Sequence, residues 1–125
     1  FYLTDLPGYG YARVAQTVKD NFDRLTDTYL NSDRPIGLVL HLLDIRHAPS
    51  EADRRMMDWL HAHDLPYQIV LTKADKLSRQ AMNLRVREMA KLLDTDPADL
   101  VPFSTTAKIG IEELRAIILN SLGLE

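Results

Sequence analysis

The chain contains no cysteine, which excludes disulfide bonds and thiolate zinc sites and fits a reducing cytoplasm. Its longest apolar stretch, residues 36–43, is far too short to span a bilayer, so we expect no membrane partner. Only five glycines occur and none precedes a lysine, so the phosphate-binding pattern GxxxxGK(S/T) is missing. A net charge of −3 argues against a surface that coats nucleic acid generally.

The size and composition are those of one ordinary globular domain. The 125 residues, 46% of them apolar and 26% charged, have room for a single hydrophobic core. The chain opens on Phe1, already inside an apolar run that reads as a strand. We therefore expect a piece cut from within a longer domain.

Four strand-like apolar runs alternate with four amphipathic segments. The runs are residues 1–4, 36–43, 67–71 and 100–103. Apolar stripes at helical spacing pass through residues 14–29, 52–60, 82–93 and 111–122. This alternation predicts a three-layer α/β/α domain, with a mainly parallel sheet covered by helices on both faces.

Polar side chains follow each of the four predicted strands. They are Asp5, Asp44, residues 72–75 and residues 104–108. Ligands of open parallel sheets bind beyond the carboxyl ends of the strands, so these positions predict one shared site. The alternative is that they are ordinary polar loops.

The motif Thr72-Lys73-Ala74-Asp75 has the chemistry to recognise guanine. A carboxylate at Asp75 would accept hydrogen bonds from both N1–H and the 2-amino group, which adenine cannot donate. Bonds of this kind are worth roughly 1.5–3 kcal/mol each, so adenine would bind on the order of a hundredfold less well. Lys73 would lay its stem along the base and tie neighbouring loops, while the Thr72 hydroxyl holds the loop. Alternatively, Asp75 is a solvated helix-capping acid.

A second wall for the base would come from Phe103, Ser104 and Thr105, at the start of the sequence FSTTAK. Backbone N–H groups of this loop would meet the O6 acceptor of guanine. Gly110 would end the loop before the last helix. The alternative is a polar turn without a ligand.

The motif Asp5-Leu6-Pro7-Gly8 suits a terminal phosphate and its magnesium ion. Asp5 would be an outer-sphere ligand of Mg²⁺, and Gly8 would let a backbone N–H approach the γ-phosphate. Alternatively, Pro7-Gly8 is a simple turn with an incidental aspartate.

Together these motifs resemble the EngB (YihA/YsxC) family of GTPases. The resemblance rests on DLPGYGYARV from residue 5, DIRHAPSEADRRMMDWL from residue 44, TKADKL from residue 72 and FSTTAKIGIEEL from residue 103. It implies a P-loop GTPase-like fold, a cytoplasmic or organellar protein, binding of GTP and GDP with Mg²⁺, and assistance to large ribosomal subunit assembly. Loss of such a protein is expected to disturb growth and septation.

The resemblance assigns Asp5 and Gly8 to switch II, and Thr72, Lys73 and Asp75 to the guanine-specificity motif. Ser104 and Thr105 match the second guanine loop. Tyr9 stands where many related GTPases have a catalytic glutamine, so no catalytic residue is assigned.

The departure from the family is the lack of the first strand, phosphate loop, first helix and switch I. We therefore expect residues 1–125 to be the C-terminal portion of a single GTPase domain, inactive alone and prone to marginal stability or a domain-swapped dimer. The alternative is an interaction module that binds a partner without nucleotide.

Several further residues have two possible roles. Arg46 and His47 would contact the ribosome or a switch, or only shape their loop; the basic residues of 76–91 would meet ribosomal RNA or be a solvated helix face. Ser50 and Asp53 predict a capping box, with Pro49 in the first helical turn.

Overall fold

The computed structural model describes residues 37–123. The predicted strand at 1–4, the predicted helix at 14–29 and the motif Asp5, Leu6, Pro7 and Gly8 lie outside the described residues. The described elements are β1 (Val39–Asp44), α2 (Glu51–Ala62), β2 (Tyr67–Thr72), α3 (Arg79–Leu92), β3 (Leu100–Pro102) and α4 (Ile111–Ser121), with single 3₁₀ turns at Ala74–Lys76 and Pro97–Asp99.

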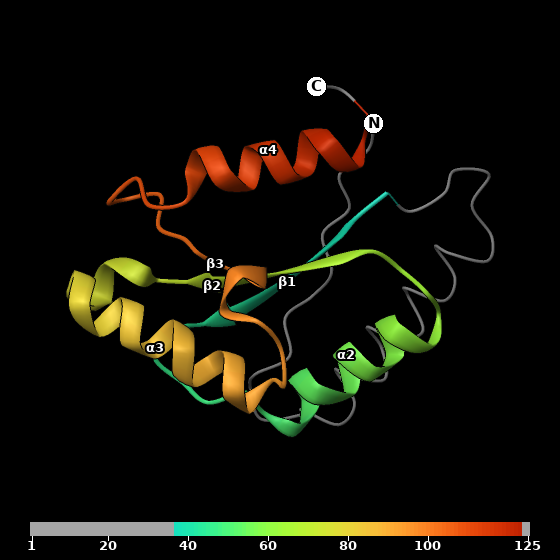
Figure 1. Cartoon of the computed structure of the whole chain (residues 1–125), viewed down its shortest axis with the longest axis horizontal. Coiled ribbons are helices and arrows are strands. Elements are labelled where there is room, and N and C mark those ends of the chain that lie inside the picture. The colour runs from blue at the N-terminus through green and yellow to red at the C-terminus, as the bar shows by residue number, and fades with distance from the viewer. Residues whose placement is uncertain (1–36, 124–125) are drawn as a thin grey trace.

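The three described strands form one parallel sheet in the order β1-β2-β3. Asp44 at the end of β1 lies opposite Thr72 at the end of β2, so both strands end at the same edge. Helices α2 and α3 lie on one side of this sheet and α4 on the other (Figure 1). The described part therefore has the predicted α/β architecture in three layers.

The hydrophobic core lies between the sheet and helices α2 and α3. Leu43, Ile69 and Leu71 of the strands are buried there together with Met57 of α2 and Met89 of α3. Leu71 and Met89 have no exposed surface, so the ends of the strands are packed tightly against the hydrophobic core.

The start of α2 follows from one local motif. The Ser50 side chain accepts from the backbone N–H of Asp53 at 3.1 Å, and the Asp53 carboxylate accepts from the Ser50 N–H at 2.8 Å. This confirms the capping box. The placement of Pro49 in the first turn was wrong: the helix begins at Glu51, because Ser50 takes the cap position and leaves Pro49 before it.

The histidines of α2 and the turn after it make separate aromatic contacts. His63 stacks on Trp59 with ring centroids 4.0 Å apart, and His61 Nε2 lies 2.7 Å from the hydroxyl of Tyr67. The two imidazoles thus contact different partners, which suits packing of α2 against the sheet edge rather than a shared ligand.

Candidate functional site

Three loops meet where the parallel strands end. The Ile45 N–H donates to the carbonyl of Thr72 at 3.0 Å, which joins the loop after β1 to the end of β2. The Ala74 N–H donates to the carbonyl of Phe103 at 3.1 Å, and the Phe103 N–H donates to that of Leu71 at 2.8 Å. Main-chain hydrogen bonds therefore bring together three of the four polar segments that the sequence predicted at one edge; the fourth, at Asp5, lies outside the described residues.

The segment Thr72 to Asp75 leaves β2 in a sharp, well-anchored turn. The Thr72 hydroxyl donates to the carbonyl of Leu43 at 3.2 Å, which is the loop-holding role expected of it. Lys73 has the left-handed φ of 61°, and Ala74, with no exposed surface, follows it into the 3₁₀ turn. A non-glycine residue in this conformation costs about 1–3 kcal/mol, so the surrounding hydrogen bonds must hold it there.

Asp75 lies beside Ser104, from the loop after β3. The Ser104 hydroxyl donates to Oδ1 of Asp75 at 2.9 Å and accepts from the Ala107 N–H at 3.1 Å. Ser104 is only 4% exposed, whereas Asp75 is exposed. The serine thus holds one oxygen of a carboxylate that belongs to an exposed residue.

The helix-capping alternative for Asp75 finds no support at α3. The N-cap of α3 is Ser78, whose side chain accepts from the Ala81 N–H at 3.1 Å. Asp75 is instead part of the preceding 3₁₀ turn, which has no side-chain cap. Its carboxylate is directed to the loop after β3 rather than to a helix end.

The loop after β3 is closed by a two-way backbone bridge. Ser104 and Ile109 exchange N–H···O bonds of 3.0 and 2.9 Å, which leaves Thr105 and Lys108 exposed at the tip. Gly110 then turns the chain into α4 with φ of 72°, and a Cβ there would lie 2.2 Å from the Pro102 carbonyl oxygen. Only glycine fits at this position, in agreement with the predicted end of the loop.

Asp44, which the sequence placed at this edge without a specific contact, lies next to these loops. Asp44 Oδ1 accepts from Arg46 Nε at 3.0 Å and Oδ2 from Nη2 at 2.8 Å, while Lys73 Nζ lies 3.4 Å from Oδ2. The Arg46 hydrogen bonds hold the pKa of Asp44 well below its usual range, against the opposing effect of burial. The same pair raises the pKa of Arg46. Lys73 therefore ties neighbouring loops, as the sequence predicted.

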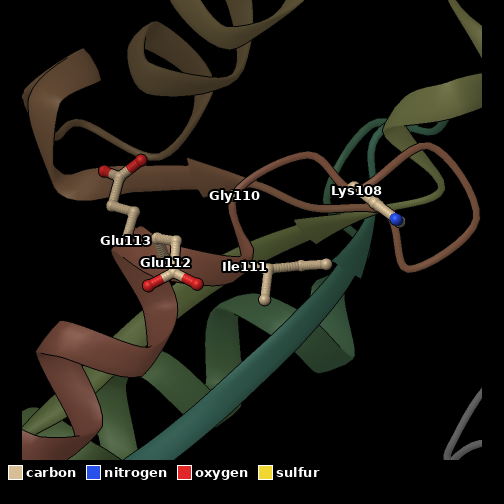
Figure 2. A pocket seen from close by; sticks show the side chains of 5 residues that line it. All are labelled: Lys108, Gly110, Ile111, Glu112 and Glu113. Carbon is tan, nitrogen blue, oxygen red and sulfur yellow. The ribbon is translucent and has the colours of Figure 1, made fainter.

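An open hollow of about 550 Å³ lies at the start of α4, lined by Lys108, Gly110, Ile111, Glu112 and Glu113 (Figure 2). Figure 2 shows the Lys108 side chain pointing away from the two glutamates. Asp75 and Ser104 do not line the hollow, and two carboxylates in the first turn of α4 disfavour a bound phosphate there. The residues predicted to read guanine therefore lie outside this hollow.

The magnesium prediction depends on a residue beyond this region. Within residues 37–123, His, Cys, Asp and Glu side chains form no group of three that would hold a metal ion. Asp5, the predicted outer-sphere ligand, lies outside the described residues.

Among the described helices, none is long and apolar enough to cross a membrane.

Comparison with known structures gives the fold. A crystal structure of a probable GTP-binding protein engB matches with a TM-score of 0.74 and 18% identity, covering 97% of this chain and 76% of that one. The described α/β architecture is thus the fold of that structure. No family model matches the chain.

Comparison with curated sequences finds relatives that share one name. The chain is 38% identical over 122 residues to the probable GTP-binding protein EngB of Shouchella clausii, covering 97% of the chain and 62% of that protein. It is 42% identical over 122 residues to the protein of the same name from Syntrophomonas wolfei, covering 98% and 63%. The chain is thus similar over nearly its whole length to proteins named EngB, in agreement with its motifs, and it spans about three-fifths of the length of these relatives.

Proposed function

We propose that this chain recognises guanine nucleotides, GTP and GDP, at the edge formed by Thr72, Lys73, Ala74 and Asp75 with Phe103, Ser104 and Thr105. The observation that carries the proposal is the 2.9 Å hydrogen bond from buried Ser104 to exposed Asp75. It orients a carboxylate at the meeting point of two strand ends, where ligands of parallel sheets bind. The relatives' printed name, probable GTP-binding protein EngB, agrees with this chemistry.

The carboxylate explains why the base would be guanine. Asp75 accepts from N1–H and from the 2-amino group, and the Ser104 hydroxyl, already donating to Oδ1, leaves lone pairs for both. Adenine has no N1–H and no 2-amino group, so its complex would leave the carboxylate desolvated and unpaired. The expected preference is on the order of a hundredfold.

The rest of the nucleotide would be held by residues beyond the described region. We propose that Gly8 meets the γ-phosphate and that Asp5 holds Mg²⁺ through a water, in a domain of which residues 1–125 are the C-terminal portion. No step of GTP hydrolysis is assigned to a residue of this chain, and Tyr9 is a poor group for orienting water. Binding by the chain alone is therefore expected to be weak, because phosphate contacts supply most of the grip on the nucleotide.

For the whole protein we propose a cytoplasmic GTPase that assists assembly of the large ribosomal subunit, with effects on septation. The family resemblance and the basic residues of α3 and the turn before it support this. Lys76, Arg79, Arg87 and Lys91 are exposed, whereas Arg85 donates to the Ile45 carbonyl at 2.8 Å and has a structural role. Charge reversal at Arg87 should weaken co-sedimentation with large subunits, and unchanged sedimentation would remove this surface from the proposal.

The test of guanine recognition is a titration of the chain with GDP and, separately, ADP, followed by backbone amide resonances. GDP should shift the signals of residues 73–75 and 104–108, and ADP should not. Asp75→Asn should reverse the preference toward xanthosine diphosphate, because an amide N–H pairs with the carbonyl that xanthine has in place of the amino group. Asp58→Asn is the matched control, because it makes the same change of charge at an exposed position of α2, and it should behave as the parent.

Absence of any response to GDP would overturn guanine recognition by this chain. That result would favour the interaction module that needs no nucleotide. Retention of GDP preference in Asp75→Asn would place recognition on other residues. Gel filtration of the same samples tests the expected swapped dimer.

A further inference from the structure

Asp44, at the end of β1 beside the proposed guanine site, makes several polar contacts. Its two oxygens face Arg46 Nε at 3.0 Å, Arg46 Nη2 at 2.8 Å and Lys73 Nζ at 3.4 Å, and Oδ1 also accepts from the Arg46 N–H at 2.9 Å. His47 Nε2 lies 3.8 Å from Oδ2. A single carboxylate thus gathers three side chains that carry or can carry positive charge at the rim of the site.

The position of this carboxylate is fixed by its neighbours. Asp44 pairs with Thr72 across the parallel ladder, and the next residue, Ile45, donates to the Thr72 carbonyl at 3.0 Å. The two side-chain bonds from Arg46 approach one oxygen each, so the carboxylate cannot rotate without breaking one of them. The side chain of Asp44 is 20% exposed, so competition from water is limited.

Lys73 has the opposite character. Its side chain is 56% exposed and has four rotatable carbon bonds, and its backbone is the left-handed start of the 3₁₀ turn. A lysine this exposed samples many rotamers unless its ammonium is held. Within residues 37–123, the Lys73 ammonium forms an ion pair with Asp44, which is the last residue of the neighbouring strand β1.

We propose that Asp44 is a positioning residue for nucleotide binding. It anchors the ammonium of Lys73 so that the aliphatic stem is ordered before the base arrives. The inference rests on the proposed guanine site and adds to it a residue that makes no contact with the base. Arg46 serves the anchor by fixing the orientation of the Asp44 carboxylate.

The proposal separates affinity from base preference. Ordering of Lys73 in advance lowers the entropic cost of binding any base that uses its stem, whereas the choice of guanine depends on Asp75. Loss of the anchor should therefore weaken GDP binding about three- to fivefold, the size that one partly exposed ion pair supports. The preference for GDP over ADP should stay unchanged.

The first arm of the test needs no nucleotide. Relaxation of the Lys73 side-chain ¹⁵Nζ in the full chain measures the order of the ammonium group. Asp44→Asn should lower that order, Asp44→Glu should restore part of it, and the control Asp58→Asn should leave it unchanged. Equal order in the parent and in Asp44→Asn overturns the proposal.

The second arm is a double-mutant cycle in the GDP titration. Lys73→Met keeps the stem and removes the charge, so Asp44→Asn should weaken binding in the parent background and have no further effect in the Lys73→Met background. Additive losses would show that Asp44 acts without Lys73 and would overturn the proposal. Matching amide spectra of the variants confirm that each is folded.

The two arms distinguish this inference from the proposed function. If Lys73 loses order in Asp44→Asn but no variant or parent responds to GDP, guanine recognition fails, and the role of Asp44 in binding fails with it, although the anchor itself exists. If GDP binds selectively but the cycle is additive, the guanine site stands and only the positioning role is wrong.

Discussion

Replacing Ser104 with alanine would remove a buried hydroxyl that serves two partners at once. The hydroxyl donates to Oδ1 of Asp75 and accepts from the N–H of Ala107, and it has almost no access to water. Its loss leaves the Ala107 N–H without this acceptor and Asp75 without its orienting donor. Each net hydrogen bond of this kind is worth about 1 kcal/mol, so Ser104→Ala should lower the free energy of unfolding by roughly 1–3 kcal/mol.

Thermal and urea unfolding followed by circular dichroism measure this loss. For a chain of this size a loss of roughly 1–3 kcal/mol corresponds to a fall in Tm of about 4–11 °C. Asp75→Asn is the informative comparison, because its amide oxygen still accepts from Ser104, so this variant should unfold near the parent temperature. A Ser104→Ala variant as stable as the parent would refute the conclusion that the two hydrogen bonds of the Ser104 hydroxyl stabilise the fold.

The same substitution also separates stability from recognition. If Ser104 orients Asp75, then Ser104→Ala and Asp75→Ala should be coupled in a double-mutant cycle, with the second change costing less after the first. In the GDP titration Ser104→Ala should lower affinity while some guanine preference remains, since Asp75 is still present. Strictly additive effects of the two substitutions would contradict a direct link between them.

Three further outcomes are expected. Gly110→Ala places a Cβ 2.2 Å from the Pro102 carbonyl oxygen, at a positive φ. It should lower the free energy of unfolding in urea by about 1–3 kcal/mol or more, and an unchanged unfolding midpoint would contradict the close approach. The pKa of Asp44 is lower in the folded than in the unfolded chain, where it is about 3.9, so its contribution to stability is full above that value and is lost as the pH falls below it. The difference in unfolding free energy between the parent and Asp44→Asn should therefore be constant above about pH 5 and shrink below about pH 4. Ser50→Ala breaks the capping box of α2 and should cost roughly 0.5–2 kcal/mol, with faster amide exchange confined to its first turn.

The strands and helices of the described region could be predicted because their sequence patterns are strong. Apolar runs bounded by polar residues placed β2 and β3 within a residue. The strand expected at residues 36–43 is β1, which ends one residue later, at Asp44, and begins only at Val39. The exception at the start of α2 is instructive. Pro49 and Ser50 are both common near helix starts, and the reciprocal bonds between Ser50 and Asp53 decided which of them takes the cap.

The candidate site was predictable in its location and only partly in its contacts. Parallel strands bring their carboxyl ends together, so the convergence of residues 72–75 with 103–105 follows from topology. The contact between Asp44 and Lys73 depends on the register that sets Asp44 opposite Thr72, and no sequence motif encodes that register. An aspartate at a strand end with an arginine two residues later was the available signal.

The peptide groups that join the loop after β2 to the loop after β3 matter for how the sequence can change. Ala74 and Phe103 are connected through N–H and C=O atoms that every residue except proline possesses in full. The Asp75 side chain adds the hydrogen bond from Ser104 to this frame, whereas the side chain of Thr105 is exposed. Because these bonds are made by the main chain, exposed side chains at this edge can change by mutation or by design while the frame that presents them persists.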